Sequence, residues 1–241
     1  MAGGRRAGQG VTAVDGAGRA TLGTTIWSRC HRAARDEGLA AAIDVLCSEL
    51  LPGLVPCGPA GHSVLPAGVA LGGRVWLDGV TFGAAAGRMR LLAAFDLPGG
   101  PLEAVRWTGP AADPAAGPND YVRAEWVLGL VWLRLGWSEG LRGHCLRYLR
   151  GRRTGDSTLL QQQLVKGSLA DVTAEQLEIR AMLLGCEADR LTPQFADELH
   201  DRITVADRAQ LRLLGASSML LGGPGEEAYV SELIADAWRS G

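Results

Sequence analysis

Lysine is almost absent from this 241-residue chain, because Lys166 is the only one and arginine carries the remaining positive charge. The 24 basic and 26 acidic side chains leave a formal net charge of −2. A chain this close to neutrality creates no overall field that attracts nucleic acid or an anionic membrane. We therefore expect neither of these partners.

Closely spaced cysteines and histidines are also missing. The five cysteines are far apart, their number is odd, and no Cys-x-x-Cys occurs. This pattern predicts buried or half-buried free thiols in a reducing compartment. The four histidines show no metal-ligand spacing, so we predict no metal site.

Long apolar segments and common catalytic motifs are absent as well. No apolar run approaches the roughly 20 residues of a membrane-spanning helix. The first ten residues contain Arg5 and Arg6 but no apolar core follows them, so they do not resemble a secretory signal. We expect a cytoplasmic protein. No P-loop, Rossmann fingerprint or Gly-x-Ser-x-Gly motif occurs, and nothing indicates nucleophilic hydrolysis.

The first half of the chain predicts short elements of both kinds. Residues 11–22 contain two short runs around Asp15-Gly16, which fit a hairpin. Residues 34–51 carry leucine and isoleucine at helical spacing and predict a helix that ends before Pro52. After a linker rich in Gly and Pro, residues 69–97 contain short β-like runs separated by glycines, and these predict a small antiparallel sheet.

From residue 120 onward, apolar residues recur at helical spacing. We predict helices over 121–149, 158–184, 192–214 and 226–238, with Thr192-Pro193 as the cap and first turn of the third. The apolar stripe of the second helix comprises Leu160, Leu164, Leu169, Val172, Leu177, Ile179 and Leu183. Four helices with short connections predict an antiparallel bundle.

The predicted fold class is therefore α+β, mostly α. A short amino-terminal hairpin and helical region (residues 1–60) precedes a small antiparallel β domain (61–117). A carboxy-terminal four-helix bundle (118–241) follows.

The most informative segment runs from Tyr148 to Asp171. It contains a helix end, a turn rich in arginine and the start of another helix. Arginine offers planar, charge-assisted donors that match phosphate oxygens. Local composition alone favours a solvated turn. The segment resembles the Tyr-x-x-x-Arg turn and the Gln-x-x-x-x-x-Leu-Ala-[Asp/Glu] helix of acyl-CoA dehydrogenases, flavoenzymes that oxidise acyl-CoA thioesters. Tyr148, Arg152, Gln163 and Asp171 match at the family's spacing.

The resemblance implies an FAD site at a dimer interface. Arg152, Thr154 and Gln163 would hold the nucleotide. Trp76 lies in a segment similar to the family's Leu-x-Gly-x-x-x-Trp strand pair, and this resemblance places it near the flavin. Gly215 belongs to a segment similar to the Leu-Gly-Gly-x-Gly loop, which would supply another nucleotide contact.

Two positions depart from the family pattern. The Phe-Gly that follows the threonine is replaced by Gly155-Asp156, so an aromatic contact is lost and a negative charge is added near the expected phosphate. In the glycine loop, Ala216 and Ser218 replace residues whose lack of a side chain lets the backbone approach a ligand.

The candidate catalytic base is Glu125. The reaction transfers an α-proton to a carboxylate while a hydride leaves the β-carbon for the flavin. Most family members carry this glutamate in a Tyr-Glu-Gly-like segment, which does not occur here. A minority, such as isovaleryl-CoA dehydrogenases, carry it near the start of the first bundle helix, where Glu125 lies one residue out of register. Alternatively, Glu125 is a first-turn acid stabilised by the helix dipole.

Three functions stay open at this point. The first is FAD-dependent α,β-desaturation of an acyl thioester by a shortened, homodimeric or homotetrameric flavoprotein. The second is a non-catalytic paralogue that serves as a dimerisation or partner subunit, paired with a full-length homologue. The third is a helical bundle unrelated to flavin chemistry. The seven tryptophans either pack core and subunit surfaces or line an acyl or flavin pocket.

Overall fold

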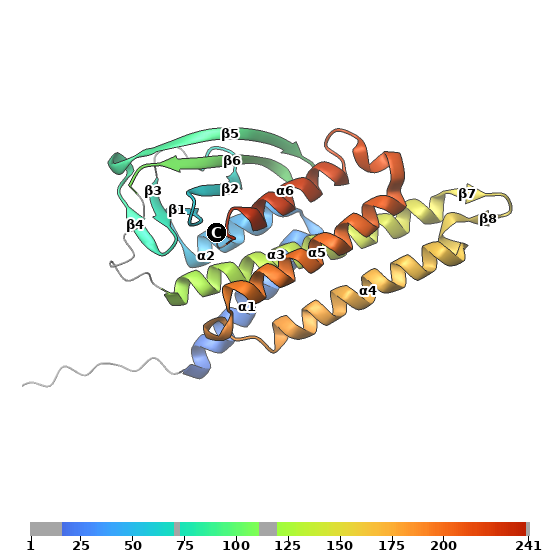
Figure 1. Ribbon diagram of the computed structural model, residues 1–241, viewed down its shortest axis with the longest axis horizontal. Helices are drawn as coiled ribbons and strands as arrows, with labels where there is room; N and C mark the ends of the chain where they lie inside the picture. Colours follow the sequence, from blue (N-terminus) through green and yellow to red (C-terminus); the bar gives the residue numbers. More distant parts are fainter. Residues whose placement is uncertain (1–15, 70–72, 111–119, 240–241) are drawn as a thin grey trace, which may run out of the picture.

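The structure is a computed structural model that describes residues 16–69, 73–110 and 120–239 (Figure 1). Within these residues it contains six α-helices. They are α1 (Gly16–Asp36), α2 (Leu39–Leu50), α3 (Asp120–Gly151), α4 (Gln163–Leu184), α5 (Pro193–Leu214) and α6 (Pro224–Asp236).

Two small sheets form one layer. Their strands are β1 (Leu54–Cys57), β2 (His62–Pro66), β3 (Arg74–Leu77), β4 (Val80–Phe82), β5 (Arg88–Leu97) and β6 (Gly100–Thr108). The strand orders are β1-β3-β4 and β2-β6-β5. All described pairs in these two sheets are antiparallel except β1 with β3, which is parallel. A third, two-stranded sheet pairs β7 (Arg153–Thr154) with β8 (Ser157–Thr158).

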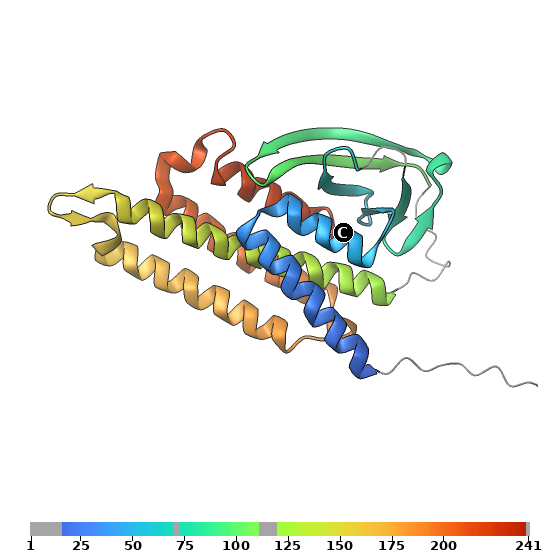
Figure 2. The ribbon, with the colours of Figure 1, turned by 180° about the vertical axis from the view of Figure 1, so that it is seen from behind.

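The helices and sheets are stacked around α3. Figures 1 and 2 show the two sheets covering α2 and α6, with α3 beneath these helices. Helix α4 lies at the edge of the bundle, away from the sheets, and the β7–β8 hairpin forms one tip of the molecule. This arrangement confirms the predicted α+β, mostly helical class.

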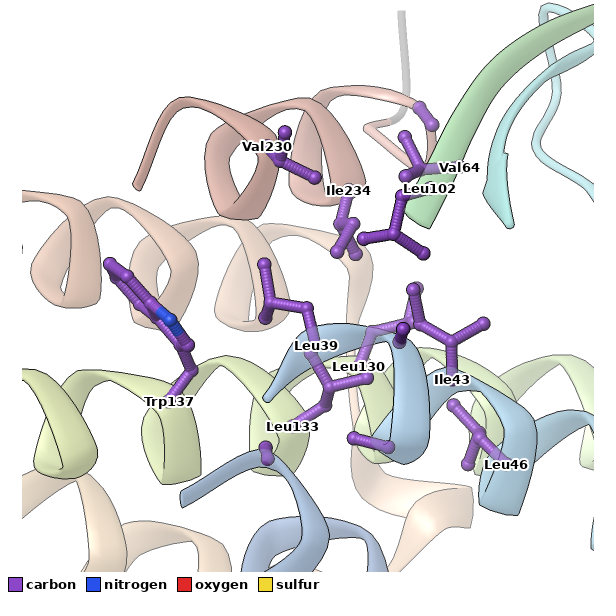
Figure 3. Packing of buried hydrophobic residues seen from close by; sticks show 14 of the residues in the cluster. Leu39, Ile43, Leu46, Val64, Leu102, Leu130, Leu133, Trp137, Val230 and Ile234 are labelled. Carbon is purple, nitrogen blue, oxygen red and sulfur yellow. The ribbon is translucent and has the colours of Figure 1, made fainter. Parts of the chain in front are cut away.

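The core joins the sheets to the helices. Leu39 of α2, Leu133 of α3 and Ile234 of α6 share one buried cluster with Leu102 of β6 (Figure 3). The stripe predicted for the first bundle helix is buried throughout: Trp126, Leu130, Leu133, Trp137, Leu141, Cys145 and Leu149. The other side of α3 packs in a second cluster with α1, α4 and α5. Helix α3 is therefore packed on two sides, whereas a surface helix has a single apolar stripe.

Several predicted boundaries differ from the structure. Residues 16–22 form part of α1, so the hairpin prediction is wrong there, and residues 11–15 lie outside the described part. The helix predicted over 34–51 is two helices, because Gly38 adopts a φ of 104° that favours glycine and separates α1 from α2. Of the predicted stripe of the second helix, Leu164 and Leu177 are 86% and 58% exposed and therefore lie outside the core.

Two further expectations, the cap of α5 and the free thiols, are confirmed. The Thr192 hydroxyl accepts a hydrogen bond from the Phe195 amide at 3.2 Å, and Pro193 begins α5. All five cysteines are free, and burial raises the pKa of the Cys145 thiol to about 12. Among the described residues there is no candidate metal cluster, and no described helix is both long and apolar enough to span a membrane.

Helices α1 and α3 approach each other at glycines. A Cβ at Gly136 would lie 2.2 Å from the carbonyl oxygen of His31, which is backbone and cannot move aside. A Cβ at Gly143 of the same helix would meet only the end of the flexible Arg147 side chain, at 3.4 Å. The close crossing therefore requires glycine at position 136 but not at 143.

We expect Gly136→Ala to lower the free energy of unfolding by about 1–3 kcal/mol, because the added methyl group overpacks the crossing. Gly143→Ala is the matched control, and we expect it to raise stability by about 0.5–1 kcal/mol, since alanine favours the helix. Urea unfolding followed by circular dichroism measures both. Equal effects of the two substitutions would contradict the described crossing.

Candidate functional site

The elbow, residues 148–163, joins α3 to α4. Thr158 and Gln161 form a reciprocal capping box, in which the Thr158 amide donates to Gln161 Oε1 at 2.9 Å. The Gln162 side chain donates to Ser157 Oγ at 2.9 Å, and the Leu159 amide donates to the Arg152 carbonyl at 2.8 Å. These bonds fix the turn.

Three of the predicted cofactor-binding residues stand on the elbow with their side chains exposed. Thr154 and Gln163 make no side-chain hydrogen bond to any residue that the structure describes, and Arg152 hydrogen-bonds to Tyr148. Gln161 and Gln162, in contrast, use their amide groups to hold the turn. The elbow therefore presents a guanidinium, a hydroxyl and an amide, which is the donor set that suits a phosphate or nucleotide.

Tyr148 connects the elbow to the loop that begins at Gly215. The Arg152 guanidinium carbon lies 4.9 Å from the centre of the Tyr148 ring, which orients the cation. A hydrogen bond from Ser217 and the charge of Arg152 lower the pKa of Tyr148. Gly215 ends α5 with a φ of 58° and would meet no atom within 4 Å if it carried a Cβ. The structure thus brings Gly215 to the same end of the molecule as Arg152.

Trp76 lies elsewhere, in a triad of tryptophans between the sheet layer and the bundle. The ring centres of Trp76 and Trp238 are 5.6 Å apart, those of Trp126 and Trp238 5.5 Å, and those of Trp76 and Trp126 6.3 Å. All three are buried, at 3%, 2% and 6% exposure for Trp76, Trp126 and Trp238. Rings in mutual contact leave no room between them for an isoalloxazine.

Glu125 is next to this triad in sequence but on another side of α3. It is 6% exposed, and its carboxylate makes no hydrogen bond or ion pair with a described residue. Adjacent residues on a helix point about 100° apart, so Trp126 occupies the direction toward Trp76. The role of Glu125 as a base stays a prediction.

Helix α3 separates the two groups of predicted residues. Arg152 follows directly after α3, 26 residues beyond Trp126, and a helix rises 1.5 Å per residue. The elbow and the triad are therefore about 40 Å apart. One extended dinucleotide cannot reach both in the same chain.

Sequence reasoning overlooked a second glycine loop. Leu221-Gly222-Gly223-Pro224-Gly225 matches the Leu-Gly-Gly-x-Gly pattern at every fixed position, which the segment at Gly215 does not. Gly222 has a φ of 66°, and a Cβ at Gly225 would lie 2.4 Å from the Ser218 carbonyl oxygen. The loop lines a cavity of about 560 Å³ together with Trp137, His144 and Arg147, among other residues. A complete search for the pattern finds it from the sequence.

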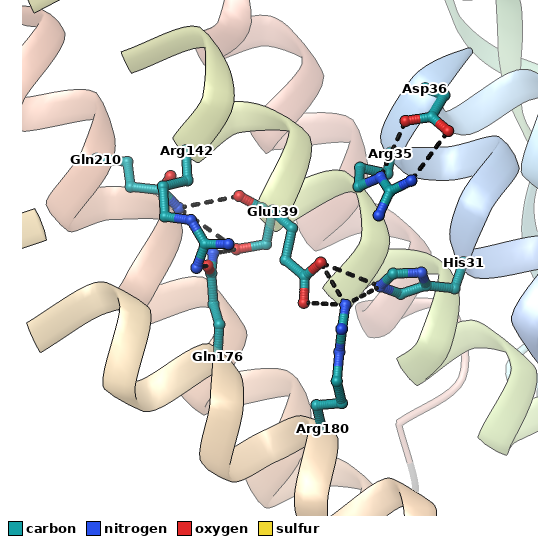
Figure 4. Close-up of polar contacts among 9 residues, drawn as sticks. His31, Arg35, Asp36, Glu139, Arg142, Gln176, Arg180 and Gln210 are labelled. Atoms are coloured by element: carbon teal, nitrogen blue, oxygen red, sulfur yellow. Dashed lines mark hydrogen bonds and ion pairs between the residues drawn. The ribbon is translucent and has the colours of Figure 1, made fainter. Parts of the chain in front are cut away.

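Charged side chains inside the bundle were also overlooked (Figure 4). Glu139 of α3 accepts a hydrogen bond from Arg180 of α4 at 2.7 Å and lies 3.3 Å from His31 Nε2 of α1. Burial disfavours the ionised Glu139, but His31 and the arginines Arg180 and Arg142 outweigh it and lower the pKa of Glu139. These partners come from three helices, so no local sequence motif indicates them.

A buried arginine and a buried acid lie deeper in the bundle. Arg134 has no exposed surface, and it donates to Ser231 Oγ at 3.0 Å, the His200 carbonyl at 3.1 Å and Thr204 Oγ1 at 2.8 Å. Burial lowers the pKa of Arg134 to about 10. Burial also raises the pKa of Asp207 to about 7, although Ser138 and Arg134 favour its ionised form.

Comparisons with solved structures show which fold this is. A variant of the Tcur3481-Tcur3483 steroid ACAD (acyl-CoA dehydrogenase) matches with a TM-score of 0.56 and 16% identity, over 90% of this chain and 76% of that chain. The ChsE4-ChsE5 complex from Mycobacterium tuberculosis matches with a TM-score of 0.53 and 17% identity, over 89% and 74%. An acyl-CoA dehydrogenase from Slackia heliotrinireducens matches with a TM-score of 0.51 and 12% identity, over 88% and 74%.

These likenesses confirm that the chain has the acyl-CoA dehydrogenase fold, as the elbow motif predicted. At such identities they show the fold alone. No family model matches the sequence, and no curated protein matches it closely enough to count as a relative.

Asp207 makes folding stability depend on pH. Its folded pKa of about 7 lies above the ordinary value of 3.8, so between these values the folded state holds a proton that the unfolded state has lost. The free energy of unfolding therefore falls as pH rises from about 4 to 7, by a few kcal/mol at most. We expect Asp207→Asn to remove this fall and to be more stable than the wild type at pH 8. Urea unfolding of both proteins at several pH values measures the slopes, and identical slopes would contradict the assignment.

Proposed function

We propose that this chain is the non-catalytic partner subunit of an acyl-CoA dehydrogenase-like assembly, in which its elbow holds the nucleotide of an FAD bound mainly by a homologous chain. One observation carries the proposal: exposed donors stand at the elbow, about 40 Å along α3 from the place where the resemblance puts the flavin. A dinucleotide held by Arg152 must therefore have its flavin in another chain.

The two ends of the chain fit FAD differently. At the elbow, the guanidinium of Arg152, the hydroxyl of Thr154 and the amide of Gln163 suit a pyrophosphate and its sugar. At the triad, Trp126 and Trp238 fill the space beside Trp76, so the residues present do not fit an isoalloxazine. We therefore assign nucleotide binding to this chain and no proton transfer.

The solved structures support pairing with a different chain. Two of them are named for two components, and the second is described as the ChsE4-ChsE5 complex. We infer a similar two-component assembly here, in which the homologous chain supplies the flavin and acyl-thioester sites. When bound, FAD accepts the hydride that leaves the β-carbon of the acyl group.

The second candidate is desaturation by this chain itself as a homo-oligomer, which the shared fold favours. That function requires the triad to open, because Trp238 lies against both Trp76 and Trp126. It also requires the buried Glu125 to turn toward the opened space. The closed triad is the reason for placing this candidate second.

The first test is co-expression with a full-length acyl-CoA dehydrogenase homologue from the same organism. We expect the two chains to co-elute as a yellow complex that shows the absorbance of a bound flavin at about 450 nm. We expect Arg152→Ala to weaken FAD binding roughly 10- to 100-fold through the loss of charge-assisted hydrogen bonds, without separating the chains. Arg150→Ala, which removes an exposed arginine two residues earlier, is the matched control and should keep the flavin. Separate elution of the two wild-type chains would overturn the proposal.

The two candidate functions separate at Glu125. In the partner-subunit assembly, Glu125→Gln leaves both flavin content and acyl-CoA turnover unchanged, because the base belongs to the other chain. If this chain is the dehydrogenase, the same change keeps the flavin and abolishes turnover. Steady-state oxidation of acyl-CoA with an artificial electron acceptor distinguishes the two results.

A further inference from the structure

Basic side chains stand directly opposite one another on one face of the β2-β6-β5 sheet. Arg90 of β5 pairs with Arg106 of β6, and Arg106 pairs with His62 of β2. Paired residues point to the same face of a sheet, and so do residues two apart along one strand, so Arg88 shares this face. We call Arg88, Arg90, Arg106 and His62 the basic row.

The charges of the basic row are not matched by acids within residues 16–69, 73–110 and 120–239. Its three arginines are exposed, and none of their side chains forms an ion pair or a hydrogen bond with a residue in these ranges. Exposed arginines elsewhere are paired, as Arg208 is with Glu232 at 2.7 Å. Because like charges directly opposite each other destabilise a sheet, the row favours an anion held between its guanidinium groups.

A small apolar cavity lies beside the basic row, between this sheet and the end of α6. Its volume is about 260 Å³, and His62 lines it. Val64 and Ala104 form part of its wall, and they pair with each other two residues along their strands from His62 and Arg106. The remaining apolar lining comes from Leu92, Val105, Leu233 and Ala237. Pockets for drug-sized ligands begin at roughly 300 Å³, so a cavity of this size suits a short chain.

Two features fit the cavity to an apolar group. The register of β5 with β6 shifts between Leu91 and Ala93, so Leu92 is an extra residue of the strand. Such a bulge redirects a side chain, and here Leu92 lines the cavity. The acid in the lining, Asp236, is ion-paired with Arg239 at 3.1 Å, so its charge is already matched. The cavity therefore offers apolar surface, and the unmatched positive charge lies beside it.

We infer that this face binds a small molecule in which an anionic head group is joined directly to a short apolar chain. The guanidinium groups of Arg90 and Arg106 hold the head group, and the cavity takes the chain. Two residues along a strand span about 7 Å, so the head group and the chain are adjacent in the ligand. A CoA thioester does not fit, because the pantetheine arm separates its phosphates from its acyl chain. Phosphate monoesters and carboxylates both have the required chemistry.

Isothermal titration calorimetry of the purified chain tests the inference with octyl phosphate, octanoate, octanol and inorganic phosphate. We expect octyl phosphate to bind at least about tenfold more tightly than inorganic phosphate, because its chain is buried, and than octanol, because its charge is paired. Comparison with octanoate shows which head group is preferred. Octyl phosphate and octanoate that bind no more tightly than octanol or inorganic phosphate overturn the inference.

Variants locate the site. We expect Arg106→Ala to raise the dissociation constant of octyl phosphate roughly tenfold, through the loss of charge-assisted hydrogen bonds. Arg32→Ala, which removes an exposed arginine of α1, is the matched control and should keep the wild-type value. We expect Ala104→Phe to fill the cavity, so that octyl phosphate binds no more tightly than inorganic phosphate. Circular dichroism checks that the variants are folded.

Unchanged binding of octyl phosphate by Arg106→Ala overturns the inference on its own, whatever Ala104→Phe does. The site includes no residue of the elbow or of the tryptophan triad. Its failure therefore leaves the proposed nucleotide site untouched, and a chain that binds no FAD leaves this site untouched.

Discussion

The contact among Trp76, Trp126 and Trp238 is the constraint on which the functional interpretation depends. It joins the sheet layer, the central helix and the segment after α6 in one buried cluster. Tight backbone packing holds the third ring in place, because a Cβ at Gly58 would lie 1.8 Å from the carbonyl oxygen of Ala237. A flavin bound between these rings would have to displace that segment. The closed triad therefore favours a role for this chain as a subunit of an assembly over catalysis by the chain itself.

Helix α3 sets the second constraint, because it is continuous from Asp120 to Gly151. It is buried on all sides from Glu125 to Glu139, and its continuity keeps the triad and the elbow at a fixed separation. The elbow presents exposed donors, whereas neighbouring polar side chains such as Gln162 are used to hold the turn. In the proposed assembly, the homologous chain covers these donors.

The sequence predicted the elements whose cause is local. Helical spacing placed the bundle helices within a few residues, and the Thr192 cap is where it was expected. It missed the break at Gly38, because apolar spacing continues across it and only the backbone angle ends the helix. It also missed β1 and β2, which lie in a segment rich in Gly and Pro. The exposure of Leu177 and the burial of Asp207 depend on neighbours from other helices, and periodicity along one helix carries no information about them.

Visible absorption of the chain purified alone tests the central claim most directly. The protein would be incubated with excess FAD, passed over a desalting column and scanned for flavin absorbance. With the triad closed and no second chain to supply a flavin site, the account predicts a colourless protein. A yellow protein that retains close to one FAD per chain would show that the tryptophans give way to a flavin, and would contradict the account.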